Sequence, residues 1–284
     1  MRQRLIPVLV LWPGLLAAGP ATSPLDISQK CDALREQWND RFAQEHLAVV
    51  IAPPFVITGD GGMEKLERYR DGTVIASQRA LQATYFEKQP TEPILIFLFE
   101  SDGPYRRLAK KWFDDDDVPH FGFYRQRENV MFMNVATGTG TLVHELVHAL
   151  MRPDFPRAPA WFNEGLASLY EQCTLNGDGI TGLLNWRLPA LKRAIEQKKL
   201  RPLRELMDDP QFYRDDRVGL NYAQARYFML YLQEHGKLQE YYRRTRDNHE
   251  NDPMGRATFE QLIAPQSLEE FDATWQQWVL KLGS

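Results

Sequence analysis

Cysteine, long apolar runs and a strong charge of either sign are all scarce in this sequence. Only two of the 284 residues are cysteines, which excludes a small domain held together by many disulfides. The 34 basic and 38 acidic residues leave a formal net charge of -4, so nothing in the charge balance favours nucleic acid or an acidic membrane surface as a partner. A hydrophobic content of 43% and a charged content of 25% are ordinary for a globular protein and exclude a disordered or collagen-like chain.

The first 21 residues are typical of a secretory signal peptide. Arg2 and Arg4 precede an apolar run from Leu5 to Ala18, and small residues follow it. The run is shorter than the roughly 20 residues that a membrane-spanning helix needs, and no later stretch approaches that length. We therefore expect an exported protein, periplasmic or secreted, without stable membrane insertion once the signal is removed. The alternative is an N-terminal anchor that is not cleaved.

Export changes how the two cysteines are interpreted. In an oxidising compartment Cys31 and Cys173 can form a single disulfide. Two separately buried thiols fit the sequence equally well, because the sequence does not show how close the two residues lie. Neither cysteine has the CxxC spacing of a redox or metal site.

Hydrophobic periodicity predicts a first half in which helices and strands are mixed. Two prolines, Pro53 and Pro54, interrupt the first strand-forming stretch. The predicted elements are helices at Ile27–His46, Thr73–Lys88 and Pro104–Phe113, and strands at Ala48–Thr58, Pro93–Glu100, Phe121–Tyr124 and Val130–Val135.

From Gly140 onward the sequence is predicted to be almost entirely helical. Ser267 and Glu270 stand at the spacing of a capping box and mark the start of the last helix. The predicted helices are Thr141–Met151, Ala160–Glu171, Trp186–Lys198, Tyr222–His235, Leu238–Arg246 and Ser267–Leu282. Together these features predict an α+β fold in one domain, 22–284, with an α/β-rich part at 22–139 and a helical part at 140–284 around one core.

The residues with most chemical meaning lie in the segment TLVHELVHAL, from Thr141 to Leu150. His144 and His148 are four residues apart, so a helix places them on one face, where both imidazoles can bind one metal ion. Glu145 is rotated from His144 by about 100°, so it projects beside the metal and not onto it. This is the HExxH pattern of zinc proteases.

A hydrolytic zinc site needs a third protein ligand and one open position. Glu164, in the segment PAWFNEGLAS from Pro159 to Ser168, can supply that ligand. A second helix that returns after a short proline-rich loop would bring its carboxylate toward the two histidines. Gly165 and Ala167 are small and would permit a close approach between helices.

HELVH followed by WFNEGLAS resembles the gluzincin branch of zinc metallopeptidases, and NEGLA is similar to the NEGxA form of its aminopeptidase group. The resemblance covers Thr141 to Tyr170. Fifteen residues separate His148 from Glu164, fewer than in the classical aminopeptidases, and no GxMEN motif precedes HExxH, so aminopeptidase activity is not implied. The pattern is more similar to compact bacterial peptidase-like proteins with a strand-rich N-terminal half. The resemblance implies a zincin-like fold.

The resemblance also implies roles for individual residues. His144, His148 and Glu164 are expected to bind Zn2+, with Glu145 as the general base that activates water for attack on a peptide bond. Tyr222 stands where gluzincins often carry a tyrosine that stabilises the oxyanion, although an ordinary aromatic residue at a helix start fits too.

Three further features have two readings each. Val130–Val135 is either an exposed edge strand that pairs with an extended peptide or a plain structural strand. The hydroxyl of Ser168 either supports a zinc ligand through a hydrogen bond or fills space between helices. The acidic run Asp114–Asp117 is most simply a solvated loop, which would favour basic substrates if it bordered the cleft, and the alternative is a calcium site, although the run lacks the spaced Asp and Gly of a known calcium loop.

The sequence therefore predicts an exported zinc metallopeptidase that acts on a peptide or protein substrate. No serine nucleophile elbow or phosphate-binding glycine loop offers another chemistry. The alternative is an exported binding or assembly protein that retains the zinc site without catalysis.

Overall fold

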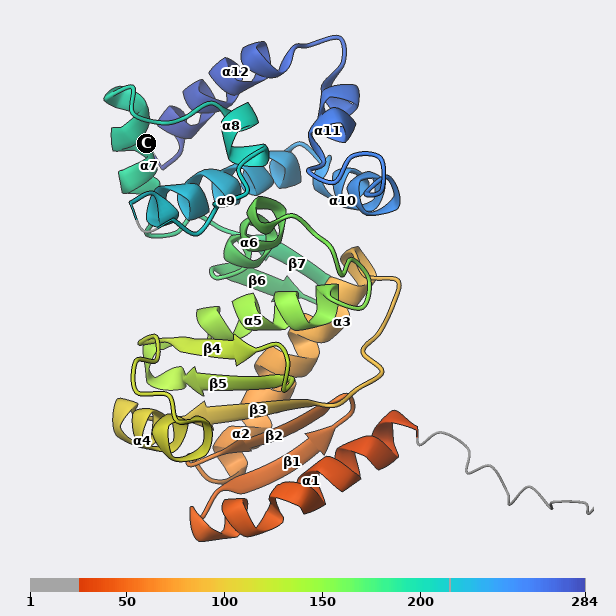
Figure 1. Ribbon diagram of the computed structural model, residues 1–284, viewed down its shortest axis with the longest axis vertical. Coiled ribbons are helices and arrows are strands. Elements are labelled where there is room, and N and C mark those ends of the chain that lie inside the picture. The colour runs from red at the N-terminus through yellow and green to blue at the C-terminus, as the bar shows by residue number, and fades with distance from the viewer. Residues whose placement is uncertain (1–25, 215, 284) are drawn as a thin grey trace, which may run out of the picture.

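The computed structural model of the protein describes residues 26–214 and 216–283 (Figure 1). The expected signal peptide therefore lies outside the described residues. Within them, no helix combines the length and the apolar character needed to cross a membrane. The fold is mixed α+β, as the sequence predicts. The strands are β1 (Ala48–Ala52), β2 (Phe55–Gly59), β3 (Ile94–Phe99), β4 (Gly122–Arg125), β5 (Val130–Asn134), β6 (Cys173–Asn176) and β7 (Gly179–Gly182).

Helices precede, connect and follow these strands. The α-helices are α1 (Ile27–Gln44), α2 (Met63–Tyr69), α3 (Ala76–Thr84), α4 (Asp102–Phe113), α5 (Gly140–Met151), α6 (Ala160–Leu169), α7 (Leu188–Glu196), α8 (Leu203–Met207), α9 (Val218–Glu234), α10 (Leu238–Asp247), α11 (Arg256–Ile263) and α12 (Leu268–Lys281). A π-helical segment, Arg70–Ile75, joins α2 to α3, and a short 3-10 turn, Val135–Thr137, precedes α5. Ser267 and Glu270 form the predicted capping box at the start of α12.

A five-stranded mixed sheet in the order β1-β2-β3-β5-β4 organises the first half. β2, β3 and β5 run parallel, and the two edge strands β1 and β4 are antiparallel to their neighbours. Every side chain of β3 is buried, because alternate residues face the two covered sides of the sheet. Ile96 packs into the larger core, whereas Phe97 packs with α1 and α4 residues on the opposite face.

The sheet order decides between the two readings of Val130–Val135. β5 lies between β3 and β4 and is paired on both sides, so it is a structural strand and offers no free edge to a peptide. The edge strand is β4, which begins at Gly122. The continuous apolar run of β5 is therefore explained by burial in the interior of the sheet.

The helical half is stacked on the sheet through α5 and α6. In Figure 1, α5 lies beside the sheet, α6 follows it, and α7 to α12 lie beyond α6. One hydrophobic core continues through these layers, from Phe55 in β2 through Leu146 in α5 and Leu166 in α6 to Trp275 in α12. The histidine-bearing helix is thus embedded between the sheet and the helical half.

Two regions differ from the sequence prediction. The helical stretch predicted to begin at Thr73 already begins at Met63. In the part predicted to be helical, β6 and β7 form an antiparallel hairpin around the turn from Asn176 to Gly179. The two cysteines, whose pairing the sequence left open, are both free thiols. Cys31 is buried between α1 and the sheet, and Cys173 begins β6.

Asp154 connects the loop between α5 and α6 to α10 and to the end of α3. Its carboxylate accepts hydrogen bonds from the backbone N–H groups of Glu87 and Lys88, at 3.0 Å each. The Tyr242 hydroxyl donates at 2.8 Å and Arg246 Nη1 at 3.0 Å. Burial alone would raise the pKa of Asp154, but the hydrogen bonds from Tyr242 and Arg246 outweigh it and lower that pKa.

We expect Asp154→Ala to lower the free energy of unfolding by about 3–5 kcal/mol, because it leaves Arg246 and two backbone N–H groups without this acceptor. Urea denaturation at pH 7 measures the change. Asp178→Ala, at a side chain that is 70% exposed, is the matched control and should change stability by less than about 0.5 kcal/mol.

The pH dependence tests the same interaction. Because the folded-state pKa of Asp154 lies below its unfolded value of about 3.9, its contribution is complete above that value and is lost as the pH falls through the folded value. The stability difference between wild type and Asp154→Ala should therefore narrow in acid. An equal difference at pH 7 and pH 3 would contradict a role for the ionised carboxylate.

Candidate metal centre

Helices α5 and α6 bring the three predicted ligands together. His144 Nε2 and His148 Nε2 lie 3.0 Å apart. Glu164 Oε2 lies 3.2 Å from the first nitrogen and 3.5 Å from the second. A cation bound tetrahedrally at ~2.0–2.2 Å separates its ligand atoms by roughly 3.3–3.6 Å. The spacing of the three atoms therefore suits one shared metal ion, and together they form a group that could hold one.

The surroundings of these atoms also suit a cation. The side chains of His144, His148 and Glu164 are only 10%, 9% and 8% exposed. Glu164 Oε2 is buried and makes no hydrogen bond, so its lone pairs remain directed at the space beside the imidazoles. Among residues 26–214 and 216–283, no other set of three His, Cys, Asp or Glu side chains is arranged in this way.

His148 is oriented by Asn163, the residue that precedes Glu164 in α6. His148 Nδ1 lies 2.9 Å from the Asn163 side-chain oxygen. Because an amide oxygen can only accept, Nδ1 carries the proton in this contact and Nε2 keeps a free lone pair toward the metal position. One short segment of α6 thus supplies both a ligand and the group that orients a second ligand.

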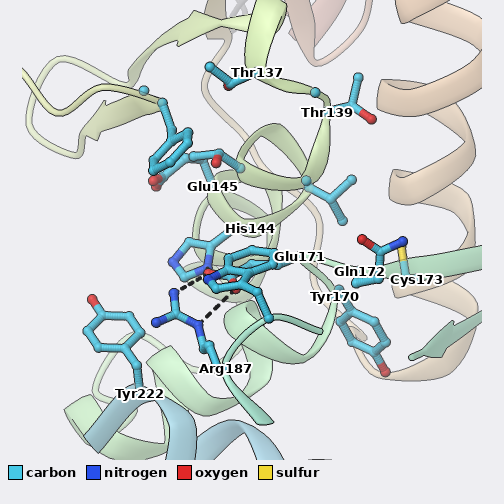
Figure 2. A pocket seen from close by; sticks show the side chains of 17 residues that line it. Thr137, Thr139, His144, Glu145, Tyr170, Glu171, Gln172, Cys173, Arg187 and Tyr222 are labelled. Atoms are coloured by element: carbon cyan, nitrogen blue, oxygen red, sulfur yellow. Dashed lines mark hydrogen bonds and ion pairs between the residues drawn. The ribbon is translucent and has the colours of Figure 1, made fainter. Parts of the chain in front are cut away.

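The neighbour of His144 Nδ1 is Glu171, just after the end of α6. This nitrogen lies 3.3 Å from Glu171 Oε1. Arg187 holds the other side of this carboxylate with two contacts, Nη2 to Oε1 at 2.9 Å and Nε to Oε2 at 3.1 Å, and Asn185 Nδ2 approaches Oε2 at 3.3 Å. Figure 2 shows the guanidinium of Arg187 directed at Glu171 beside His144. Burial raises the pKa of Glu171, but the contact with His144 and the hydrogen bonds from Arg187 outweigh it and lower that pKa.

Two glycines allow the helices to approach as closely as this site requires. A Cβ at Gly140, the first residue of α5, would lie 2.3 Å from the carbonyl oxygen of Glu171. A Cβ at Gly165 would lie 3.1 Å from the carbonyl oxygen of Ala225 in α9. Gly165 therefore permits a close approach as predicted, and the neighbouring helix is α9. Ser168 is buried and its hydroxyl makes no hydrogen bond, which leaves it a packing role.

Glu145 lines the same cleft as His144, and Figure 2 shows both side chains there. Burial raises the pKa of Glu145, and the negative charges of Glu164 and Glu171 add to the rise, whereas the two histidines oppose it. A carboxyl group with a raised pKa next to a candidate metal position can accept a proton and return it.

Tyr222, the predicted oxyanion residue, lies in α9 beside His144. Its ring is stacked near that of His144, with the ring centroids 6.4 Å apart. Burial raises the pKa of Tyr222, and the nearby charge of Glu164 raises it further. Tyr213, in the loop between α8 and α9, was not predicted, yet its hydroxyl donates to Glu164 Oε1 at 2.8 Å.

The open side of these residues is a cleft of about 840 Å³. His144 and Glu145 line it, together with residues from the start of β4, the loop before α5, the end of α6 and the segment before α7. The lining residues are Phe121, Gly122, Thr137, Gly138, Thr139, Gly140, Thr141, Val143, His144, Glu145, Tyr170, Glu171, Gln172, Cys173, Trp186, Arg187 and Tyr222.

The ligand set makes a direct prediction about stoichiometry. The wild-type protein should bind one divalent transition-metal ion per chain. His148→Ala and Glu164→Ala should each abolish stoichiometric binding, because two ligands cannot compensate for the desolvation of the ion. Metal analysis by mass spectrometry after dialysis against Zn2+, Co2+ or Mn2+ measures both stoichiometry and preference. His235→Ala is the control, since His235 bonds only within its own helix. Full binding by Glu164→Ala would rule out this ligand set.

Glu171 should act on the metal through His144. We expect Glu171→Gln to weaken metal binding by about 10- to 100-fold, because the neutral amide supports the imidazole less well than a carboxylate. Competition with a chromogenic chelator measures the dissociation constant. Glu196→Gln, at an exposed position near the end of α7, is the matched control. Unchanged affinity in Glu171→Gln would show that the contact with His144 is only structural.

Comparisons with known proteins leave the site to be interpreted from its own geometry. No protein-family model matches the chain, and no curated protein matches it. The inference of function therefore depends on the ligand atoms, the neighbouring carboxyl group and the cleft.

Proposed function

We propose that the protein is an exported zinc metallopeptidase of the gluzincin type with a zincin-like fold. The observation that carries the proposal is the convergence of His144 Nε2, His148 Nε2 and Glu164 Oε2 within 3.5 Å of one another, with Glu145 beside them at an open cleft. Two imidazoles and one carboxylate are the protein ligands of one well-known class of catalytic zinc sites, which keep a further position for water or substrate.

His144, His148 and Glu164 would hold the zinc ion. When bound there, zinc supplies a Lewis acid that lowers the pKa of water and polarises a substrate carbonyl. The remaining chemistry falls to Glu145, whose carboxylate takes a proton from the attacking water and then delivers it to the nitrogen of the departing amine. The raised pKa of Glu145 suits both halves of this transfer.

Tyr222 is the group best placed to stabilise the negative charge that develops on the carbonyl oxygen. It lines the cleft next to His144. Because burial and Glu164 raise its pKa, the phenol stays protonated and can donate a hydrogen bond throughout the neutral pH range. The hydroxyl of Tyr213 is already engaged with Glu164 and is better suited to orienting that ligand.

The edge strand β4 supports a peptide as substrate. β4 pairs with β5 on one side only, and it packs near α5, which carries His144 and Glu145. Phe121 and Gly122, at the start of this strand, line the cleft. An extended peptide that adds to the edge of β4 by main-chain hydrogen bonds would pass beside the metal position. Export, with residues 1–21 as the signal, would place the enzyme in the periplasm or outside the cell.

The sharpest test of this function is Glu145→Gln. We expect the zinc-loaded variant to lose about 10²- to 10⁴-fold in kcat/KM, because it cannot accept the proton, while its zinc content stays at the wild-type level. Mass spectrometry of a peptide library incubated with wild type, variant and chelator-treated protein gives the rates.

Glu250→Gln is the matched control, because this side chain is 83% exposed and lies away from the cleft residues. It should cleave at the wild-type rate. Equal activity of Glu145→Gln and wild type would overturn the mechanism. If the wild-type protein binds zinc fully but hydrolyses no peptide, the non-catalytic binding role is favoured.

A further inference from the structure

Exposed large apolar side chains are concentrated near the candidate site. Among the described residues, those with more than a third of their surface exposed are Met63, Phe121, Leu183, Leu184, Trp186 and Tyr213. Phe121 and Trp186 line the cleft that contains His144 and Glu145, and Tyr213 bonds to Glu164. Leu183 and Leu184 belong to the segment that leads to Trp186. Such clustering differs from the single, scattered apolar residues of an ordinary surface and is typical of a binding site.

Phe121 and Trp186 are the most exposed of the aromatic cleft residues, at 52% and 63%. They come from separate parts of the chain, since Phe121 precedes β4 and Trp186 precedes α7. Trp186 is held next to a fixed group, because the guanidinium of Arg187 lies 5.4 Å from its ring centroid and is itself paired with Glu171. The ring therefore offers a preorganised apolar surface at the cleft.

The charged groups of the cleft are already engaged. Arg187 and Glu171 neutralise each other at 2.9 Å, while His144 and Glu145 belong to the candidate catalytic centre. The other lining residues are neutral. The acidic run Asp114–Asp117 does not line the cleft, and three of its carboxylates pair with Lys110 or Arg125. A charged substrate side chain would thus find no free partner at the cleft.

We propose that Phe121 and Trp186 determine specificity by binding a bulky apolar side chain of an extended peptide next to the bond that is cut. The occupant is aromatic or a long aliphatic, since burying such a side chain against an exposed aromatic ring gives the largest hydrophobic gain. The inference rests on the proposed peptidase function and adds the class of substrate. It requires only that the peptide, aligned along β4, crosses the cleft near His144.

Cleavage of matched peptides tests the inference. Two series share one sequence and differ at a single position beside the cut, with Phe, Trp or Leu in one and Ser, Asp or Lys in the other. We expect zinc-loaded wild type to prefer the apolar series by about 10- to 100-fold in kcat/KM. Trp186→Ala should remove most of that preference, because kcat/KM falls much more on the Phe peptide than on the Ser peptide, and Phe121→Ala should have a smaller effect in the same direction.

Met63→Ala is the control, because Met63 is 49% exposed and lies outside the cleft lining. It should leave the preference intact. Thermal unfolding checks that each variant is folded, and Trp186→Phe, which keeps an aromatic ring, should retain most of the preference. An equal loss on both peptide series, or no loss in Trp186→Ala, would overturn the role of Trp186 in specificity.

Peptide binding separates this inference from the proposed function. Fluorescence anisotropy of the labelled Phe and Ser peptides on zinc-loaded Glu145→Gln protein reports binding without hydrolysis. The inference is supported if this protein binds the Phe peptide in preference to the Ser peptide and if adding Trp186→Ala abolishes that preference. Should wild type then cleave no peptide, only the proposed peptidase function fails. Cleavage by wild type without any apolar preference leaves the peptidase function standing and refutes the inference.

Discussion

The site depends on one electrostatic constraint: three carboxylates lie close together around two largely buried imidazoles. Glu164 and Glu171 each keep only 8% of their side chain exposed, and Glu145 lies beside them. Like charges in such a place are costly unless each is paired or neutralised. Arg187 compensates Glu171, and the raised pKa of Glu145 lowers the cost of the third carboxylate. Glu164 and the two histidine nitrogens that face it form a group that could hold a metal ion, which would balance the charge of this carboxylate.

The packing of α5, α6 and α9 places these side chains next to one another. α6 lies between α5 and α9, so it can present Glu164 to the histidines of α5 while its other side rests on α9. The missing Cβ of Gly140 lets the start of α5 meet the carbonyl of Glu171, and the missing Cβ of Gly165 does the same for α6 on α9. A larger residue at either position would push apart helices that carry ligands or their supports, so the geometry of the metal position is fixed by backbone contacts as much as by side chains.

The sequence predicts the parts of the site that are local. His144 and His148 share a face because they are one helical turn apart, and Glu164 could be found from its motif. Glu171 follows Glu164 by seven residues, or two helical turns, so helical periodicity predicts that the two carboxylates lie on one face. The HExxH and NEGLA motifs do not include Glu171. Tyr213 had no such signal, because only the tertiary path of its loop brings it to Glu164.

The fold, like the site, could be predicted from the sequence only where the signal is local. β3 and the long helices were predictable from periodicity, whereas the order of the strands depends on pairings between distant segments. That is why β5 could not be distinguished from an edge strand such as β4. The β6–β7 hairpin did have a local signal, since Gly177 and Asp178 are a favoured pair for a two-residue turn, but its strands are only four residues long and half of their residues are exposed.

Arg187 joins the metal-binding residues to the cleft surface. Its guanidinium pairs with Glu171, which supports His144, and the same group lies 5.2 Å from the ring of Tyr222 and 5.4 Å from that of Trp186. A cation placed among two aromatic faces and a carboxylate restrains all of them together. Arg187 would therefore help to orient His144 through Glu171, and it also contacts Trp186 in the apolar wall of the cleft. In the proposed enzyme, substrate selection and metal-ligand geometry would both depend on the ion pair between Arg187 and Glu171.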